Sequence, residues 1–153
     1  GDDLLNDIFK NSPLLIAAHC EDEQTIRENL KEAGLKYNNE IPAFCHAVIR
    51  SAEACYLSSS KAVELAVKHD ARLHVLHLST AREMELFSRG RVKDKNITAE
   101  VCVHHLWFDE KDYEFSSQFL VHLPSFNFIM VDFRNSVEMA NILLVAQISI
   151  LNL

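Results

Sequence analysis

Residues 72–80 read RLHVLHLST, and this stretch decides the fold of the chain. Leucine and valine make it nearly continuously apolar, and a serine and a threonine follow at its end. A continuous apolar run is typical of a strand buried on both faces, and Ser or Thr after it can accept hydrogen bonds from the first backbone N–H groups of a helix. The stretch therefore predicts a buried strand that ends at His77 and leads into a helix.

Two further segments repeat this pattern of an apolar strand with histidine at its last residues. Residues 14–20 read LLIAAHC and contain His19, and residues 97–105 read ITAEVCVHH and contain His104 and His105. Strands that alternate with helical segments pair in parallel through right-handed crossovers. In such folds, sites are built at the carboxyl ends of the strands. The sequence therefore predicts an α/β fold, a section of a barrel, with histidines gathered at one end.

The segments between these strands have the spacing of amphipathic helices. Gly34 is expected to end the second helix, because glycine commonly follows the last turn of a helix. The next segment, residues 35–47, contains Pro42 and is expected to be a loop. Helices are expected at residues 1–11, 22–33, 50–69 and 81–88.

The character of the sequence changes after about residue 113. Residues 1–113 carry the strand and helix pattern and form the predicted partial barrel, whereas residues 114–153 form a divergent, mostly apolar segment. Within it, residues 133–153 are compatible with a helix, but polar residues interrupt the run too often for a membrane span. A partial barrel leaves open strand edges, so we expect self-association unless this segment folds back over the sheet.

Composition restricts the classes of partner and the compartment. The chain has 153 residues, 48% of them hydrophobic, and a formal net charge of −7. That charge argues against nucleic acid or an anionic membrane as the main partner. The four cysteines form no Cys-x-x-Cys pair and lie in or beside apolar segments. This usage indicates reduced thiols and a cytoplasmic protein.

His19 and His77 occupy equivalent places on successive predicted strands. Neighbouring strands lie roughly 5 Å apart, so two side chains at such ends can reach one ion. Neutral imidazole is a common ligand of Zn²⁺ and related metals. The alternative is that each histidine is a hydrogen-bonded residue at the end of a core strand. The residues alone leave both interpretations open.

The other polar candidates have structural alternatives. His74 lies on the opposite side of its strand and is interpreted as structural. Of His104 and His105, at most one faces the site, as a third ligand or a substrate contact, because adjacent strand residues point in opposite directions; packing at an edge is the alternative. For Arg50 and Glu53 we favour an ion pair at a helix start over an anion-binding site.

Four stretches of the chain resemble dihydroorotases, members of the cyclic amidohydrolases together with hydantoinases and allantoinases. The similarity covers about residues 4–113 in unbroken order. It implies a (β/α)₈ TIM barrel of the metal-dependent amidohydrolase type, with the three predicted strands as its fifth, sixth and seventh. The four stretches are residues 15–22 (LIAAHCED), 49–56 (IRSAEACY), 73–80 (LHVLHLST) and 97–106 (ITAEVCVHHL).

The resemblance also implies an activity and a site. By this resemblance, His19 and His77 hold the more buried ion of a two-metal centre, expected to be Zn²⁺. The small-molecule substrates are N-carbamoyl-aspartate and dihydroorotate, interconverted in pyrimidine biosynthesis. A metal ion explains how water becomes reactive towards the ring amide near neutral pH.

The sequence departs from the family pattern in ways that affect activity. The family's first-strand His-x-His pair, its fourth-strand bridging group and its eighth-strand aspartate have no counterpart here, and no resemblance extends beyond about residue 113. The chain alone is therefore expected to be inactive. The alternatives are a non-catalytic dihydroorotase-like scaffold or regulatory module, and a fragment of a hydantoinase or allantoinase.

Overall fold

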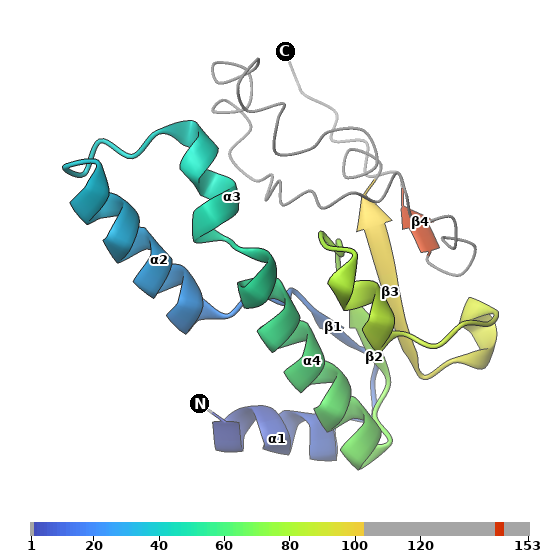
Figure 1. The fold of residues 1–153 in the computed structure, drawn as a ribbon. Coiled ribbons are helices and arrows are strands. Elements are labelled where there is room, and N and C mark those ends of the chain that lie inside the picture. The colour runs from blue at the N-terminus through green and yellow to red at the C-terminus, as the bar shows by residue number, and fades with distance from the viewer. Residues whose placement is uncertain (1, 103–142, 146–153) are drawn as a thin grey trace, which may run out of the picture.

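The computed structural model describes residues 2–102 and 143–145, and these residues form an α/β arrangement (Figure 1). Helices and parallel strands alternate along the chain, as the sequence predicts. In chain order the elements are α1 (Asp2–Asn11), β1 (Ile16–Ala18), α2 (Glu23–Lys36), η1 (Ala43–Cys45), α3 (His46–Ile49), α4 (Ala52–His69), β2 (Leu73–Val75), η2 (Arg82–Leu86), η3 (Val92–Asp94), β3 (Ile97–Cys102) and β4 (Leu143–Val145), where η marks a 3₁₀ helix.

The described strands form one sheet in the order β1-β2-β3-β4, and every neighbouring pair is parallel. Leu73 of β2 pairs with Ile16 on one side and with Ile97 on the other. The predicted set of three adjacent parallel strands is therefore confirmed. The strands end earlier than expected, and Val103 lies outside the described residues.

β4 corrects the expectation for part of the C-terminal run. Residues 143–145, within a segment that is compatible with a helix, form a strand whose Leu143 pairs with Glu100 of β3. Without β4, the outer edge of β3 would present unpaired backbone N–H and C=O groups, and pairing with residues 143–145 satisfies them. The predicted boundary at residue 113 lies outside the described residues, so this division of the chain stays a prediction.

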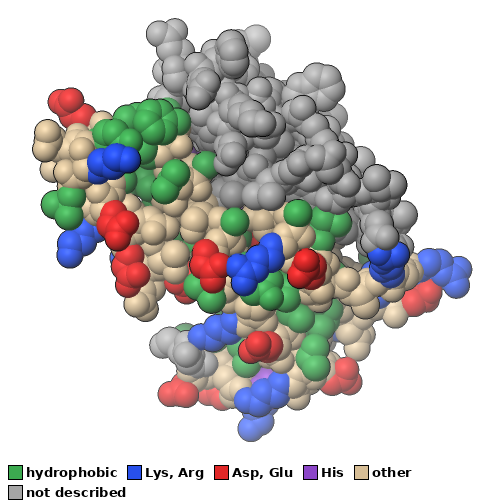
Figure 2. Space-filling view, in the orientation of Figure 1, with side chains coloured by type: hydrophobic (Ala, Val, Ile, Leu, Met, Phe, Trp, Pro, Cys, Tyr) green, Lys and Arg blue, Asp and Glu red, His purple; other side chains and the backbone are tan. Residues whose placement is uncertain are grey.

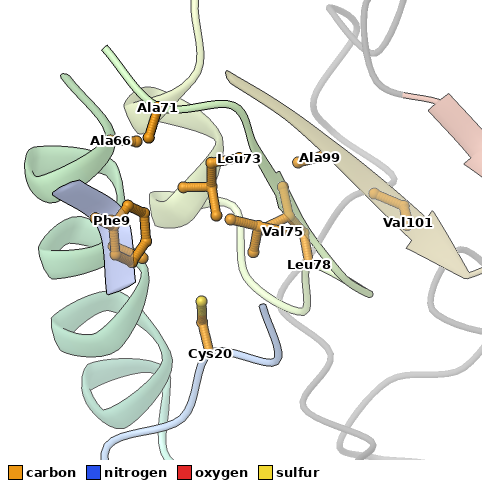
Figure 3. Packing of buried hydrophobic residues seen from close by; sticks show 10 residues of the cluster. Phe9, Cys20, Ala66, Ala71, Leu73, Val75, Leu78, Ala99 and Val101 are labelled. Atoms are coloured by element: carbon orange, nitrogen blue, oxygen red, sulfur yellow. The ribbon is translucent and has the colours of Figure 1, made fainter. Parts of the chain in front are cut away.

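The hydrophobic core lies between the sheet and the helices α1 and α4 (Figures 1 and 3). Leu73 and Val75 of β2 are 0% and 1% exposed, and Phe9 of α1 packs into the same cluster. Alanines on α4, such as Ala66, let the helix backbone approach the sheet. Full burial of each Leu or Val side chain contributes roughly 1.5–3 kcal/mol. The core thus holds β2 in place. It therefore also determines that the chain leaves the sheet after Val75, two residues before His77.

The start of α2 agrees with the sequence, but its end does not. Asp22 caps the helix, since its carboxylate accepts hydrogen bonds from the backbone N and the hydroxyl of Thr25 at 2.9 and 2.8 Å. The prediction that Gly34 ends the helix is wrong, because α2 continues to Lys36. Gly34 is buried, and a Cβ added there would lie 3.0 Å from the side-chain oxygen of Asn39. Glycine therefore permits a close approach here and does not end the helix.

Two other predicted segments differ from the structure. The expected loop 35–47 contains the end of α2, the 3₁₀ helix η1 and the first residues of α3. The expected helix 81–88 is the shorter 3₁₀ helix η2, and Glu83 within it folds back onto the backbone of Thr80. The helix expected at residues 50–69 is present as α4, with Ser51 as its N-cap. In the described part of the chain, no helix has the length and apolar character needed to cross a bilayer.

Figure 2 shows positively and negatively charged side chains interspersed over one face of the molecule. Ion pairs between elements are also present. Arg82 of η2 approaches Glu53 of α4 to 2.5 Å, and its guanidinium carbon lies 3.7 Å from the centre of the Tyr56 ring. These exposed contacts join η2 to α4, next to the chain segment that carries His77.

Candidate functional site

Two histidines approach each other where β1 and β2 end. Nδ1 of His19 lies 2.7 Å from Nε2 of His77, and the two ring centroids are 4.5 Å apart. The prediction that the side chains at these two strand ends lie close to each other is confirmed. Their role as metal ligands stays a prediction.

The register of the two strands does not by itself produce this approach. Ala18 pairs with Val75, and the N–H of Leu76 donates to the carbonyl of Ala18 at 2.9 Å. His19 therefore lies beside Leu76, and strict alternation would put His77 on the core face, with Val75. The two histidines are offset by one residue, so the expected equivalence of their positions is wrong.

A backbone turn at His77 accounts for the difference. Its φ is 38°, in the left-handed region, where a residue other than glycine is uncommon and costs roughly 1–3 kcal/mol. Leu78, the next residue, returns to the core and is 1% exposed. The imidazole of His77 is thus directed towards His19 by a local departure from strand geometry that no periodicity in the sequence predicts.

Glu21 fixes the other side of the His19 ring. Its carboxylate oxygen Oε2 lies 2.8 Å from Nε2 of His19, and the same oxygen forms an ion pair with Arg50. A carboxylate only accepts, so His19 carries its proton on Nε2 and presents the lone pair of Nδ1 to His77. Carboxylates orient metal-binding histidines in this way in many proteins.

The role of Glu21 is not predicted from the sequence above, although the spacing His-x-Glu at a strand end places both side chains on one side. Arg50 forms the ion pair with Glu21, and Glu53 forms one with Arg82, so both are in ion pairs with distant segments.

The surroundings favour neutral groups at this site. Burial lowers the pKa of His77, and the neighbouring His19 lowers it further. Neutral imidazole is the form that binds metal ions. Burial also raises the pKa of the Cys20 thiol to about 11, which keeps it protonated at neutral pH. Cys20 therefore fills the core, as expected, and all four cysteines are buried and form no disulfide.

His74 lies away from this pair. Its Nδ1 is 2.8 Å from the hydroxyl of Thr98, and its Nε2 is 3.1 Å from a carboxylate oxygen of Glu100. These partners belong to β3 and lie on the face of the sheet opposite the core, which agrees with a structural role. His104 and His105 lie outside the described residues.

The two converging nitrogens fit two positions around one metal ion. Nitrogens bound to a tetrahedral zinc ion at about 2.0–2.1 Å lie roughly 3.3–3.4 Å apart. The distance of 2.7 Å is therefore about 0.6 Å too short, a change within reach of small ring rotations. Within residues 2–102 and 143–145, no group of three or more His, Cys, Asp or Glu side chains is arranged to hold a metal ion. The described part of the chain thus brings two imidazole nitrogens together at this place, without a third metal-binding side chain.

Comparisons with known proteins show what the chain resembles. No protein-family model matches it. A dihydroorotase from Methanosphaera stadtmanae is 32% identical over 114 residues, which are 74% of this chain and 26% of that protein. A dihydroorotase from Pediococcus pentosaceus is 33% identical over 103 residues, 67% of this chain and 23% of that protein. The chain spans about a quarter of the length of these curated relatives.

The fold of the chain is also similar to that of solved cyclic amidohydrolase structures. The dihydropyrimidinase from Brevibacillus agri matches with a TM-score of 0.64 and 26% identity, over 74% of this chain and 25% of that one. A D-hydantoinase matches with a TM-score of 0.64 and 24% identity over the same shares. The expected resemblance to dihydroorotases and other cyclic amidohydrolases is therefore confirmed, and the described residues form a section of that fold.

Proposed function

We propose that this chain, which is similar to dihydroorotases over about three-quarters of its length, is a section of a dihydroorotase-like hydrolase that acts on cyclic amides. The observation that carries the proposal is the approach of His19 Nδ1 to His77 Nε2 at the ends of adjacent parallel strands. The names of the relatives favour a hydrolase over a non-catalytic scaffold. They also favour dihydroorotate and N-carbamoyl-aspartate as the small-molecule substrates of the complete enzyme.

The residues of this chain would hold and orient a divalent ion such as Zn²⁺. His19 and His77 would be its ligands, and Glu21 keeps the proton of His19 on the nitrogen that faces away from His77. Burial keeps His77 neutral and ready to bind. When bound, a divalent ion acts as a Lewis acid and makes water reactive near neutral pH.

We place β1, β2 and β3 as the fifth, sixth and seventh strands of a (β/α)₈ barrel. Their order, their parallel pairing and the histidines that follow β1 and β2 support this assignment. The described ligand pair is one short of the three protein ligands that catalytic zinc sites use. The remaining ligands and the general base of the complete enzyme are therefore assigned to residues outside this pair.

Calorimetric titration of the chain with Zn²⁺ tests the proposal. We expect weak binding that is lost in His19→Ala and in His77→Ala, because each change leaves a single ligand. His74→Ala is the matched control, since His74 lies on β2, the strand that leads to His77, but bonds to Thr98 and Glu100 of β3 on the other face of the sheet. Binding that survives both ligand changes, or is lost in the control alone, would exclude the site.

A further inference from the structure

Glu83 is a buried carboxyl group that the proposed metal site does not use. Its residue is 2% exposed, and it lies in η2, between α4 and the segment that follows β2. Oε1 is 2.5 Å from the hydroxyl of Ser59 on α4. Oε2 accepts hydrogen bonds from the hydroxyl and backbone N of Thr80 at 2.9 and 3.2 Å, and from the backbone N of Ser79 at 3.4 Å. One side chain thus joins a core helix to two consecutive residues after His77.

The segment of these two residues is also hydrogen-bonded to the backbone of His77. The hydroxyl of Ser79 donates to the carbonyl oxygen of His77 at 3.0 Å. The N–H of Leu78 donates to the carbonyl of Glu100 at 2.8 Å, which ties the same segment to β3. The chain from Ser59 through Glu83 and Ser79 to His77 is therefore continuous in hydrogen bonds.

The conformation of His77 needs such support. A non-glycine residue with φ of 38° persists where surrounding contacts determine it, because the regular strand conformation is otherwise favoured. Regular geometry at this residue would place the ring on the core face, away from His19. The segment that follows β2 must therefore be held from both ends, by β2 on one side and by the contacts of Glu83 on the other.

We propose that Glu83 is a positioning residue that holds His77 in its left-handed conformation and so keeps its imidazole facing His19. The effect of Glu83 on metal binding rests on the proposed function, whereas its effect on the orientation of the His77 ring does not. The burial of the carboxyl group supports the assignment, because burial raises the pKa of Glu83 and favours the neutral form. The hydroxyl of Ser59 donates to one oxygen of the carboxyl group, and the other oxygen accepts from Ser79 and Thr80, so both oxygens have partners.

This arrangement predicts different results for two substitutions of the same residue. Glutamine has the same shape and can donate from its amide nitrogen to Ser59 and accept at its amide oxygen, so Glu83→Gln should keep the site. Alanine removes every contact, so Glu83→Ala should release the segment. Glu85→Gln is the matched control, since Glu85 lies on the same 3₁₀ helix and is exposed.

The experiment uses the ¹⁵N-labelled chain without metal and then with Zn²⁺. Long-range proton–nitrogen correlation spectra should show hydrogen-bonded Nε2 of His77 in the unmodified chain, in Glu83→Gln and in Glu85→Gln. In Glu83→Ala this signal should move to the position of a free imidazole. The Zn²⁺ dissociation constant should rise about 10- to 100-fold in Glu83→Ala and stay unchanged in the other two.

Two further variants separate positioning from general stability. Phe9→Leu perturbs the core from α1 and should lower the melting temperature without moving the His77 signal. Ser59→Ala removes the anchor on α4 with a smaller change than Glu83→Ala, and it should shift the His77 signal in the same direction even if Glu83→Ala does not fold. An unmoved signal in Ser59→Ala and Glu83→Ala, or an equal shift in Phe9→Leu, would overturn the proposal.

Failure of the proposed function has a different signature. If the chain binds no Zn²⁺ through His19 and His77, the titrations with Zn²⁺ show no binding at this site in any variant. The imidazole spectra recorded without metal still decide whether Glu83 positions His77. A His77 signal that depends on Glu83 then supports the positioning role alone.

Discussion

Nδ1 of His19 lies 2.7 Å from Nε2 of His77, although the register of β1 and β2 sets His19 beside Leu76. The contact exists because the backbone of His77 leaves the strand conformation. On the other side of the pair, Glu21 holds the His19 ring and is itself paired with Arg50. The two rings are thus held in place independently, one by a charged pair and the other by a hydrogen-bonded segment.

Glu21→Gln is predicted to weaken Zn²⁺ binding. The amide can present its NH₂ group to Nε2 of His19, which would shift the histidine proton to Nδ1 and remove the lone pair that faces His77. We expect the dissociation constant to rise about 10- to 100-fold by calorimetry. Glu23→Gln, an exposed change two residues away, is the control and should have no effect. Equal binding by both variants would show that Glu21 does not orient the ring.

The chain alone is predicted to show no dihydroorotase turnover. Two ligands leave an ion poorly held, and the family's bridging group and general base have no counterpart in the sequence. Absorbance measurements of dihydroorotate hydrolysis with purified chain and added Zn²⁺ should give the uncatalysed rate. A zinc-dependent rate that disappears in His77→Ala would refute this prediction.

Stability should fall as pH rises because of Glu83. Burial raises the pKa of this carboxyl in the folded chain above its unfolded value of about 4.3. Between these two values the folded state binds the extra proton, so the free energy of unfolding decreases with increasing pH and then levels off above the folded pKa.

Comparison of Glu83→Gln with the unmodified chain measures this contribution. The difference in urea midpoint between them should be smallest below about pH 4 and grow in favour of Glu83→Gln as pH rises through the folded pKa. Glu85→Gln should follow the unmodified chain at every pH. A midpoint difference that stays constant with pH would show that Glu83 has the same pKa in both states.

The chain is predicted to associate with itself through β1. Among the described residues β1 pairs only with β2, so its other edge has unpaired backbone groups. Leu14 and Leu15, just before it, are 72% and 47% exposed. Sedimentation velocity should show oligomers that decrease when Leu15→Lys places a charge beside this edge. A single monomeric species at every concentration would contradict the prediction.

The sequence predicts the regular part of this fold well. Residues 73–75 and 97–102 lie in segments rich in apolar residues, and the alternate residues that face the core, such as Leu73, Val75 and Val101, are buried as this pattern predicts. The predicted starts of α2 and α4 lie within two residues of the observed ones, where the side chains of Asp22 and Ser51 accept from backbone N–H groups three residues further on. Local hydrogen bonding and hydrophobic burial decide these features.

The features that shape the site depend on contacts between distant residues. The left-handed turn at His77 is not signalled by any glycine or asparagine, and the contact of Glu83 with Ser59 joins residues from different helices. Gly34 lies inside α2, where a Cβ would lie 3.0 Å from the side-chain oxygen of Asn39, and this close approach is likewise a tertiary feature. Pattern reasoning identified His19 and His77, but the tertiary contacts that orient them have no periodic signature.

The central claim is that His19 and His77 bind one metal ion together. X-ray absorption at the zinc edge counts imidazole ligands directly in the chain loaded with Zn²⁺. The account predicts two imidazoles per bound zinc in the unmodified chain and in His74→Ala, and the spectrum of the free aquated ion in His19→Ala and in His77→Ala, which no longer retain zinc. A spectrum that His77→Ala leaves unchanged would contradict it.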